Sequence, residues 1–419
     1  MAVPSSSQNN FSTSGSGDNT GFQTALTSLM VLFFMMGFIT CLNDILVPYL
    51  KKVFDLTYTQ AALIQFCFFG AYAVMSIPSS KIVETYGYKK GMIFGFLVAA
   101  TGCFLFVPAV ALHSYGVFLG ALFILATGIV LLQVAANPYV AILGSPDTAS
   151  ARLTLNQALN SVGTFLAPFF GSYFILSALD KAGSGAVKIP YICIALTLIT
   201  IALIISRLKL PEIKAADTDA DLHNDDTKHA SAWNYSHLVM GALGIFAYVG
   251  AEVAIGSYLV NYLGLPDVAG LKEAEAAHYV AYYWGGAMVG RFLGAYLLQK
   301  FNPGKILAIN ALFAIVLILT SISSVGSVAM YTIILVGLCN SIMFPTIFTL
   351  ALKGLGKHTT QGSGILSTAI VGGAIIPVIQ ASLADNPNVG LRYAFIIPAV
   401  CYLYIVWFGL KGHKEKQAA

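Results

Sequence analysis

The sequence predicts an all-α membrane protein with twelve transmembrane helices in two six-helix bundles. Of the 419 residues, 57% are hydrophobic and only 10% are charged, whereas an ordinary globular chain has roughly 25% charged residues. Apolar segments of about 20 residues recur along the chain, each long enough to cross ~30 Å of hydrocarbon as a helix. One polar stretch divides these segments into two sets of six.

The elements follow in order from this pattern. Residues 1–21 are rich in Ser, Gly and Asn and lack Lys and Arg, which predicts a disordered cytoplasmic tail and not a signal peptide. The first bundle, residues 22–206, is predicted to hold helices at 24–49, 57–80, 91–112, 115–143, 153–179 and 189–206. Residues 207–235 form a polar linker. The second bundle, residues 236–411, is predicted to hold helices at 236–263, 277–300, 304–324, 328–352, 362–384 and 391–410, before a tail at 412–419.

The basic residues predict the orientation. Loops on the side of the two termini, together with the C-terminal tail, hold 15 Lys and Arg, and the opposite side holds six. Because Lys and Arg gather in cytoplasmic loops, both termini are expected in the cytoplasm. All six cysteines fall inside apolar segments and are interpreted as packing residues. The lack of a disulfide framework and of a signal peptide favours a bacterial inner membrane.

The two halves repeat each other. Gly163 and Pro168 lie five residues apart in the fifth predicted helix, and Gly372 and Pro377 lie five apart in the eleventh, 209 residues later. Such matches between two sets of six helices indicate a parallel duplication. A substrate site near the midplane, between the two bundles, is expected from such a repeat.

Asp44 is the most informative side chain. It lies next to Asn43 inside the first predicted helix, and an ionisable group at membrane depth costs at least ~2.5 kcal/mol, so it usually faces a cavity and has a function. Pro48 has no N–H and leaves the Asp44 carbonyl without its helical donor. Glu252 is the only other acid inside a predicted helix, and the 209-residue offset matches it with Asn43.

Amides complete the polar lining. Gln133 and Asn137 are four residues apart, and Gln157 and Asn160 are three apart, so each pair shares a helix face. Tyr248 precedes Glu252 by four residues. The predicted substrate-binding residues are Asn43, Asp44, Gln133, Asn137, Gln157, Asn160, Tyr248, Glu252 and Asn340. Any one of these amides could instead join helices, since buried amides do so at ~0.6 kcal/mol per bond.

Two further prolines free backbone oxygens beside these groups. Pro138 removes the helical donor of the Val134 carbonyl, and Pro345 that of the Ser341 carbonyl. Both freed oxygens are expected to find other partners near the site.

This lining suits a neutral monosaccharide. Amides donate and accept hydrogen bonds, and aromatic faces cover C–H surfaces. An anion would need an intramembrane cation, and the one candidate, Arg291, is expected near the cytoplasmic end of its helix. The acids fit a coupling cation, since one charge moving inward gains ~2.3 kcal/mol per 100 mV. The predicted cation-coupling residues are Asp44, Asn43, Gln133 and Glu252.

Other functions find less support in the sequence. None of the seven His lies well inside a predicted helix, and there is no HExxH or GxSxG motif, so an enzyme is not expected. No cofactor and no nucleic-acid partner are expected, and the predicted partners are the sugar, the cation and the lipid bilayer. The chain is expected to function as a monomer. An uncoupled sugar uniporter stays open as an alternative.

Six stretches resemble the fucose/glucose–galactose permeases of the major facilitator superfamily. They are GFITCLNDILVPYLK (37–51), QVAANPYVAILG (133–144), RLTLNQALNSVGTFLAP (152–168), FAYVGAEVAIGSYLVNYLG (246–264), GRFLGAYLLQKFNPGKILA (290–308) and MFPTIFTLALKGLGKHTTQGSGILSTAIVGGAIIPV (343–378). The resemblance implies a twelve-helix sugar symporter. It also implies that Asp44 is the essential aspartate of the first helix and that Gln157 and Asn160 are the amides of the fifth.

One departure from the family bears on the coupling ion. The fucose-permease branch has a glutamate where this chain has Gln133, and an amide where it has Glu252. This exchange resembles the glucose/galactose branch, in which sodium coupling is known. A neutral amide oxygen can ligate Na⁺ but carries no proton near neutral pH. Na⁺ held by Asp44 and Gln133 is therefore favoured, with an H⁺-coupled symporter of fucose or a related sugar as the alternative.

Overall fold

The computed structural model describes residues 18–54, 58–171, 173–174, 187–208, 210 and 230–414, without the side chains at 18–25, 43–49, 51–52, 58–62 and 274. Within these ranges every regular element is helical and no strand is present. Each of the twelve predicted crossings overlaps a described helix, and residues 175–179 of the fifth lie outside the described residues. Eight helical segments of this part are long and apolar enough to span a membrane.

The first half contains five α-helices in the described residues. They are α1 (Asp18–Phe54), α2 (Tyr58–Ala111), α3 (Tyr115–Ile142), α4 (Ala149–Gly171) and α6 (Lys188–Arg207). As one straight helix, the 54 residues of α2 would be ~81 Å long, far more than a bilayer needs. The helix breaks at Gly87, whose φ of 83° lies in the left-handed region that glycine adopts readily. α2 therefore holds the second and third predicted crossings.

In the second half, three crossings are single helices and three are broken. The single ones are α7 (Ser236–Leu263), α8 (Glu273–Lys300) and α9 (Pro303–Ser323). The tenth crossing is α10 (Gly326–Asn340) with α11 (Met343–Leu352), the eleventh is α12 (Thr359–Thr368) with η7 (Ala369–Val371) and α13 (Gly372–Ala384), and the twelfth is α14 (Gly390–Ala394) with α15 (Ile396–Trp407) and η8 (Phe408–Gly412). Pro345 accounts for the break between α10 and α11, because it leaves the Ser341 carbonyl without a helical donor.

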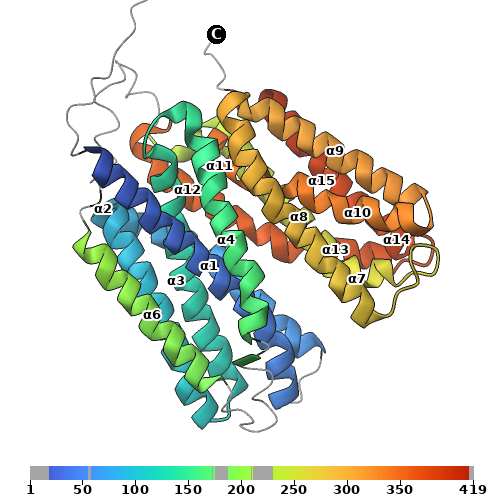
Figure 1. Cartoon of the computed structure of the whole chain (residues 1–419), viewed down its shortest axis with the longest axis horizontal. Coiled ribbons are helices and arrows are strands. Elements are labelled where there is room, and N and C mark those ends of the chain that lie inside the picture. The colour runs from blue at the N-terminus through green and yellow to red at the C-terminus, as the bar shows by residue number, and fades with distance from the viewer. Residues whose placement is uncertain are drawn as a thin grey trace, which may run out of the picture.

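The helices form two bundles that meet along one seam (Figure 1). In the seam α4 packs against α8 and α11, and α12 packs against α2 and α3. The bundles approach each other at the face where the described chain begins and ends, which we call the terminal face, and diverge toward the opposite face (Figure 1). This arrangement confirms the predicted architecture of two helical bundles.

The internal repeat is visible in one pair of helix crossings. A Cβ added to Gly163 would lie 2.1 Å from the carbonyl oxygen of Phe34, and one added to Gly372 would lie 2.1 Å from the carbonyl oxygen of Phe246. The fifth crossing thus meets the first, and the eleventh meets the seventh, through close backbone contact at the matched glycines. Small residues allow such close helix packing in membranes.

Gly163→Ala and Gly372→Ala should each lower the unfolding free energy by about 1–3 kcal/mol, because the added methyl group must push two backbones apart. Gly120→Ala on α3 is the matched control, since nothing lies within 4 Å of its added Cβ. Thermal unfolding of the purified protein in detergent measures the effect. Equal stability of all three variants would contradict the close crossings.

Candidate functional site

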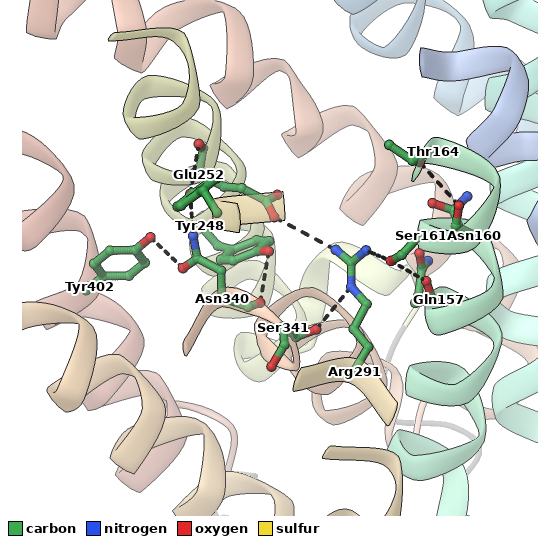
Figure 2. Close-up of polar contacts among 11 residues, drawn as sticks. Gln157, Asn160, Ser161, Thr164, Tyr248, Glu252, Arg291, Asn340, Ser341 and Tyr402 are labelled. Atoms are coloured by element: carbon green, nitrogen blue, oxygen red, sulfur yellow. Dashed lines mark hydrogen bonds and ion pairs between the residues drawn. The ribbon is translucent and has the colours of Figure 1, made fainter. Parts of the chain in front are cut away.

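Arg291 of α8 lies where the two bundles meet, and it contacts both (Figure 2). Its Nη2 atom is 3.8 Å from Oε1 of Glu252 on α7. Its Nε atom donates to the carbonyl oxygen of Ser341, at 3.3 Å. Its Nη1 atom donates to Oγ of Ser161 on α4, in the first bundle. One guanidinium group therefore connects the seventh, eighth and tenth crossings with the fifth.

Arg291 lies in the second half of α8, as the sequence indicated, and it also contacts the predicted site residue Glu252. α8 continues for nine residues beyond Arg291, to Lys300, a distance of ~14 Å along the helix. The side chains of Arg291 and Glu252 are 14% and 13% exposed, so both are largely withdrawn from solvent. Pairing is what such buried charges require. Sequence position alone did not reveal the pair, because Glu252 lies 39 residues before Arg291 on another helix.

Asn340, a predicted substrate ligand, is fully buried among tyrosines. Its Nδ2 atom donates to the Tyr283 hydroxyl at 2.8 Å, and its Oδ1 atom accepts from the Tyr402 hydroxyl at 2.6 Å. Its backbone oxygen accepts from the Tyr248 hydroxyl at 3.1 Å. Both ends of this amide are therefore engaged inside the second bundle, and its role as a ligand stays a prediction.

The tyrosine cluster also supports Glu252. The hydroxyl of Tyr283 donates to the backbone oxygen of Glu252 at 3.3 Å. Tyr248, predicted from its spacing to share a face with Glu252, is buried and uses its hydroxyl on Asn340. Sequence reasoning missed Tyr402 entirely and gave Tyr283 no role, since neither residue stands at an informative spacing from a polar group.

The two predicted amides on α4 have different environments. Asn160 donates from Nδ2 to the backbone oxygen of Phe33 at 3.0 Å, which ties α4 to α1. Gln157 is partly exposed, and its side chain makes no hydrogen bond within the described residues. Its backbone oxygen accepts from the Ser161 hydroxyl at 3.0 Å. Gln157 is therefore free to bind a ligand beside the contact between Ser161 and Arg291 (Figure 2).

The amides on α3 also differ from each other. Gln133 donates from Nε2 to the Tyr72 hydroxyl at 2.9 Å, and its amide oxygen stays outside that bond. Asn137 is 0% exposed, and neither of its amide atoms has a hydrogen-bond partner among the described residues. Burial without a partner makes this amide unfavourable in the observed arrangement.

Two predicted site residues fall outside this description. Asn43 and Asp44 lie on α1, but their side chains are not among the described ones. In the described residues no group of three or more His, Cys, Asp or Glu side chains could hold a metal ion. The proposed ligand pair of Asp44 and Gln133 stays a prediction.

Both freed carbonyls have found partners near the seam. The oxygen of Ser341 accepts from Arg291, as described above. The oxygen of Val134 accepts from the hydroxyl of Ser363 on α12, at 3.0 Å, across the seam. These contacts agree with the expectation drawn from Pro138 and Pro345.

Comparison with known proteins adds the family context. The sequence model of the Major Facilitator Superfamily matches residues 28–376. The chain is 55% identical to a glucose/galactose transporter of Brucella abortus over 401 residues, which cover 95% of each chain. It is 33% identical to the L-fucose-proton symporter of Escherichia coli over 417 residues, which cover 94% of each. A solved structure of FucP in the outward conformation matches with a TM-score of 0.84 and 32% identity, covering 95% of this chain and all of FucP.

Two buried amides should respond oppositely to replacement by leucine. Asn340→Leu should lower the unfolding free energy by about 2–3 kcal/mol, because the buried hydroxyls of Tyr283 and Tyr402 lose their partner. Asn137→Leu should be neutral or stabilising, since it removes two unpartnered polar groups. Thermal unfolding in detergent measures both variants. A destabilised Asn137→Leu beside an unaffected Asn340→Leu would reverse the assignment.

Proposed function

The chain belongs to the major facilitator superfamily, and we propose that it carries a neutral hexose such as glucose or galactose, together with a cation, by alternating access. It is a multi-pass membrane transporter and not an enzyme. The proposal assigns it to a bacterial inner membrane, with both termini in the cytoplasm. The names of its relatives, glucose/galactose transporter and L-fucose-proton symporter, support a sugar as the substrate.

The observation that carries the proposal is the internal pairing of Arg291 with Glu252. The pair has no net charge, so the described part of the site offers no unmatched charge to an ionic substrate. What it offers are amides and hydroxyls, of which the side chain of Gln157 is unoccupied. Groups that both donate and accept hydrogen bonds suit the hydroxyls of a sugar.

The coupling cation is assigned to Asp44. Glu252 was also predicted to take part, but Arg291 already supplies its counter-charge. Na⁺ is favoured, because the amide oxygen of Gln133 is left free by the bond from Nε2 to Tyr72 and could complete the ion's shell. H⁺ coupling is the second candidate, favoured by the 33% identity to a proton symporter.

The closed terminal face suggests the order of events. Cation and sugar enter from the opposite face, where the bundles diverge (Figure 1). The loaded bundles then rock about the site, which requires the bonds across the seam to break. They include Ser363 to Val134 and a 2.6 Å contact between the hydroxyls of Ser150 and Thr349. Cation and sugar must raise each other's affinity by one shared factor.

Asp44→Asn should abolish uphill sugar uptake while leaving sugar exchange across the membrane intact, because the amide cannot supply the cation's counter-charge. In proteoliposomes, a tenfold Na⁺ gradient with choline as the replacement should drive about tenfold accumulation by the parent if one Na⁺ moves per sugar. Asp385→Asn, at an exposed position after α13, is the matched control.

The same uptake at two pH values separates the candidate ions. Uptake that follows Na⁺ and ignores the pH gradient supports sodium, and the reverse supports protons. Accumulation retained by Asp44→Asn would remove Asp44 from coupling, and uptake that never exceeds equilibrium would make the protein a uniporter.

A further inference from the structure

We propose that the contact between Arg291 and Ser161 is a latch that holds the terminal face closed, and that its release is a step of the transport cycle. The second clause rests on the proposed function, and the first stands on geometry alone. Arg291 is on this account a positioning residue that links the site to the seam.

The first argument is the nature of the bonds that cross between the bundles. In the described residues four hydrogen bonds do so: Tyr88 to Thr360, Ser150 to Thr349, Ser363 to Val134 and Arg291 to Ser161. Only the last of these involves a charged group. Hydrogen bonds with one ionised partner are roughly twice as strong as neutral ones. The contact of Arg291 with Ser161 is therefore expected to be the strongest single bond across the seam.

The second argument is the place of Arg291 in the seam. Two helical turns further along α8, toward the terminal face, Leu298 packs with Ala151 and Ile342 in a small buried apolar cluster. Between them, a Cβ added to Gly294 would lie 3.8 Å from Cγ2 of Thr154 on α4, in the other bundle. The seam beyond Arg291 is thus closely packed, and the guanidinium lies at its inner end, beside the candidate site.

The third argument is that Arg291 keeps two partners in its own bundle when its contact with Ser161 is broken. Glu252 and Ser341 belong to the same bundle as Arg291, whereas Ser161 belongs to the other. Separation at the terminal face therefore removes Ser161 and leaves the other two. The 3.8 Å separation from Glu252 exceeds an ordinary hydrogen bond, and Oε1 of Glu252 has no hydrogen-bond partner among the described residues. The guanidinium can close this gap, so opening leaves no buried charge unpaired.

The fourth argument is the link from the latch to the substrate face. The hydroxyl of Ser161 accepts from Arg291 and donates to the backbone oxygen of Gln157. A ligand bound by the Gln157 amide would lie one helical turn from the latch. Binding and release can thus act on each other through a single turn of α4.

The latch predicts that Ser161→Ala exposes the seam. The probe is Leu298→Cys, at a site that is 1% exposed in the closed seam. A water-soluble maleimide labels the cysteine at position 298, and peptide mass spectrometry measures the labelling rate. The protein is held in lipid nanodiscs, where both membrane faces are accessible, so the rate does not depend on orientation. Combining Ser161→Ala with Leu298→Cys should raise the labelling rate roughly tenfold, because the hydrogen bond from the charged Arg291 is lost. Ser161→Thr keeps the hydroxyl and should restore slow labelling.

Thr164→Val is the matched control on the same helix. The Thr164 hydroxyl bonds only within the first bundle, to the backbone oxygens of Asn160 and Gly37. Thermal unfolding confirms that each variant is folded. Unchanged labelling with Ser161→Ala, or equally fast labelling with Thr164→Val, overturns the latch. Fast labelling in Ser161→Ala supports the latch even if the parent transports no sugar, a result that would overturn the proposed function alone.

Discussion

The structure depends on providing hydrogen-bond and ion-pair partners for one guanidinium group, that of Arg291, inside an apolar bundle. A charge at membrane depth is tolerated only with partners. Arg291 has three, and each imposes a condition on the fold. The Ser341 carbonyl is available because Pro345 breaks the tenth crossing. α8 can approach this break because residue 290 is glycine, whose added Cβ would lie 2.6 Å from Ser341. The third partner, Ser161, fixes where α4 meets the second bundle.

In each half a proline frees a backbone carbonyl, but the two carbonyls bind different donors. Each half has this proline in its fourth crossing, and the freed carbonyl lies near the seam. In the first half the freed oxygen of Val134 accepts from a neutral hydroxyl of the other bundle, on Ser363. In the second half the freed oxygen of Ser341 accepts from a cation. The freed carbonyl thus takes a neutral donor from the other bundle in the first half and a charged donor from its own bundle in the second.

The helices were predictable from the sequence and the side-chain partners were not. Apolar length and proline position are local properties, so they gave the twelve crossings and the two freed carbonyls. The partner of Arg291 is set by how α7 and α8 pack, which no spacing within either helix encodes. For the same reason Asn340 was predicted as a ligand, although Tyr283 and Tyr402 engage both ends of its amide. Gln157, predicted from its spacing to Asn160, has a side chain that makes no hydrogen bond within the described residues.

The position of the second carboxylate bears on the choice of coupling ion. In the fucose-permease branch that the sequence resembles, the acid stands in the fourth crossing, where this chain has Gln133. Here the acid stands in the seventh crossing, as Glu252, beside Arg291. A carboxylate paired with a guanidinium leaves no charge for a further cation to neutralise. The pair therefore adds no net charge, and in the proposed function Asp44 is the acid that binds the cation. A single monovalent cation would neutralise Asp44. The site would then require the cation before it accepts a neutral sugar.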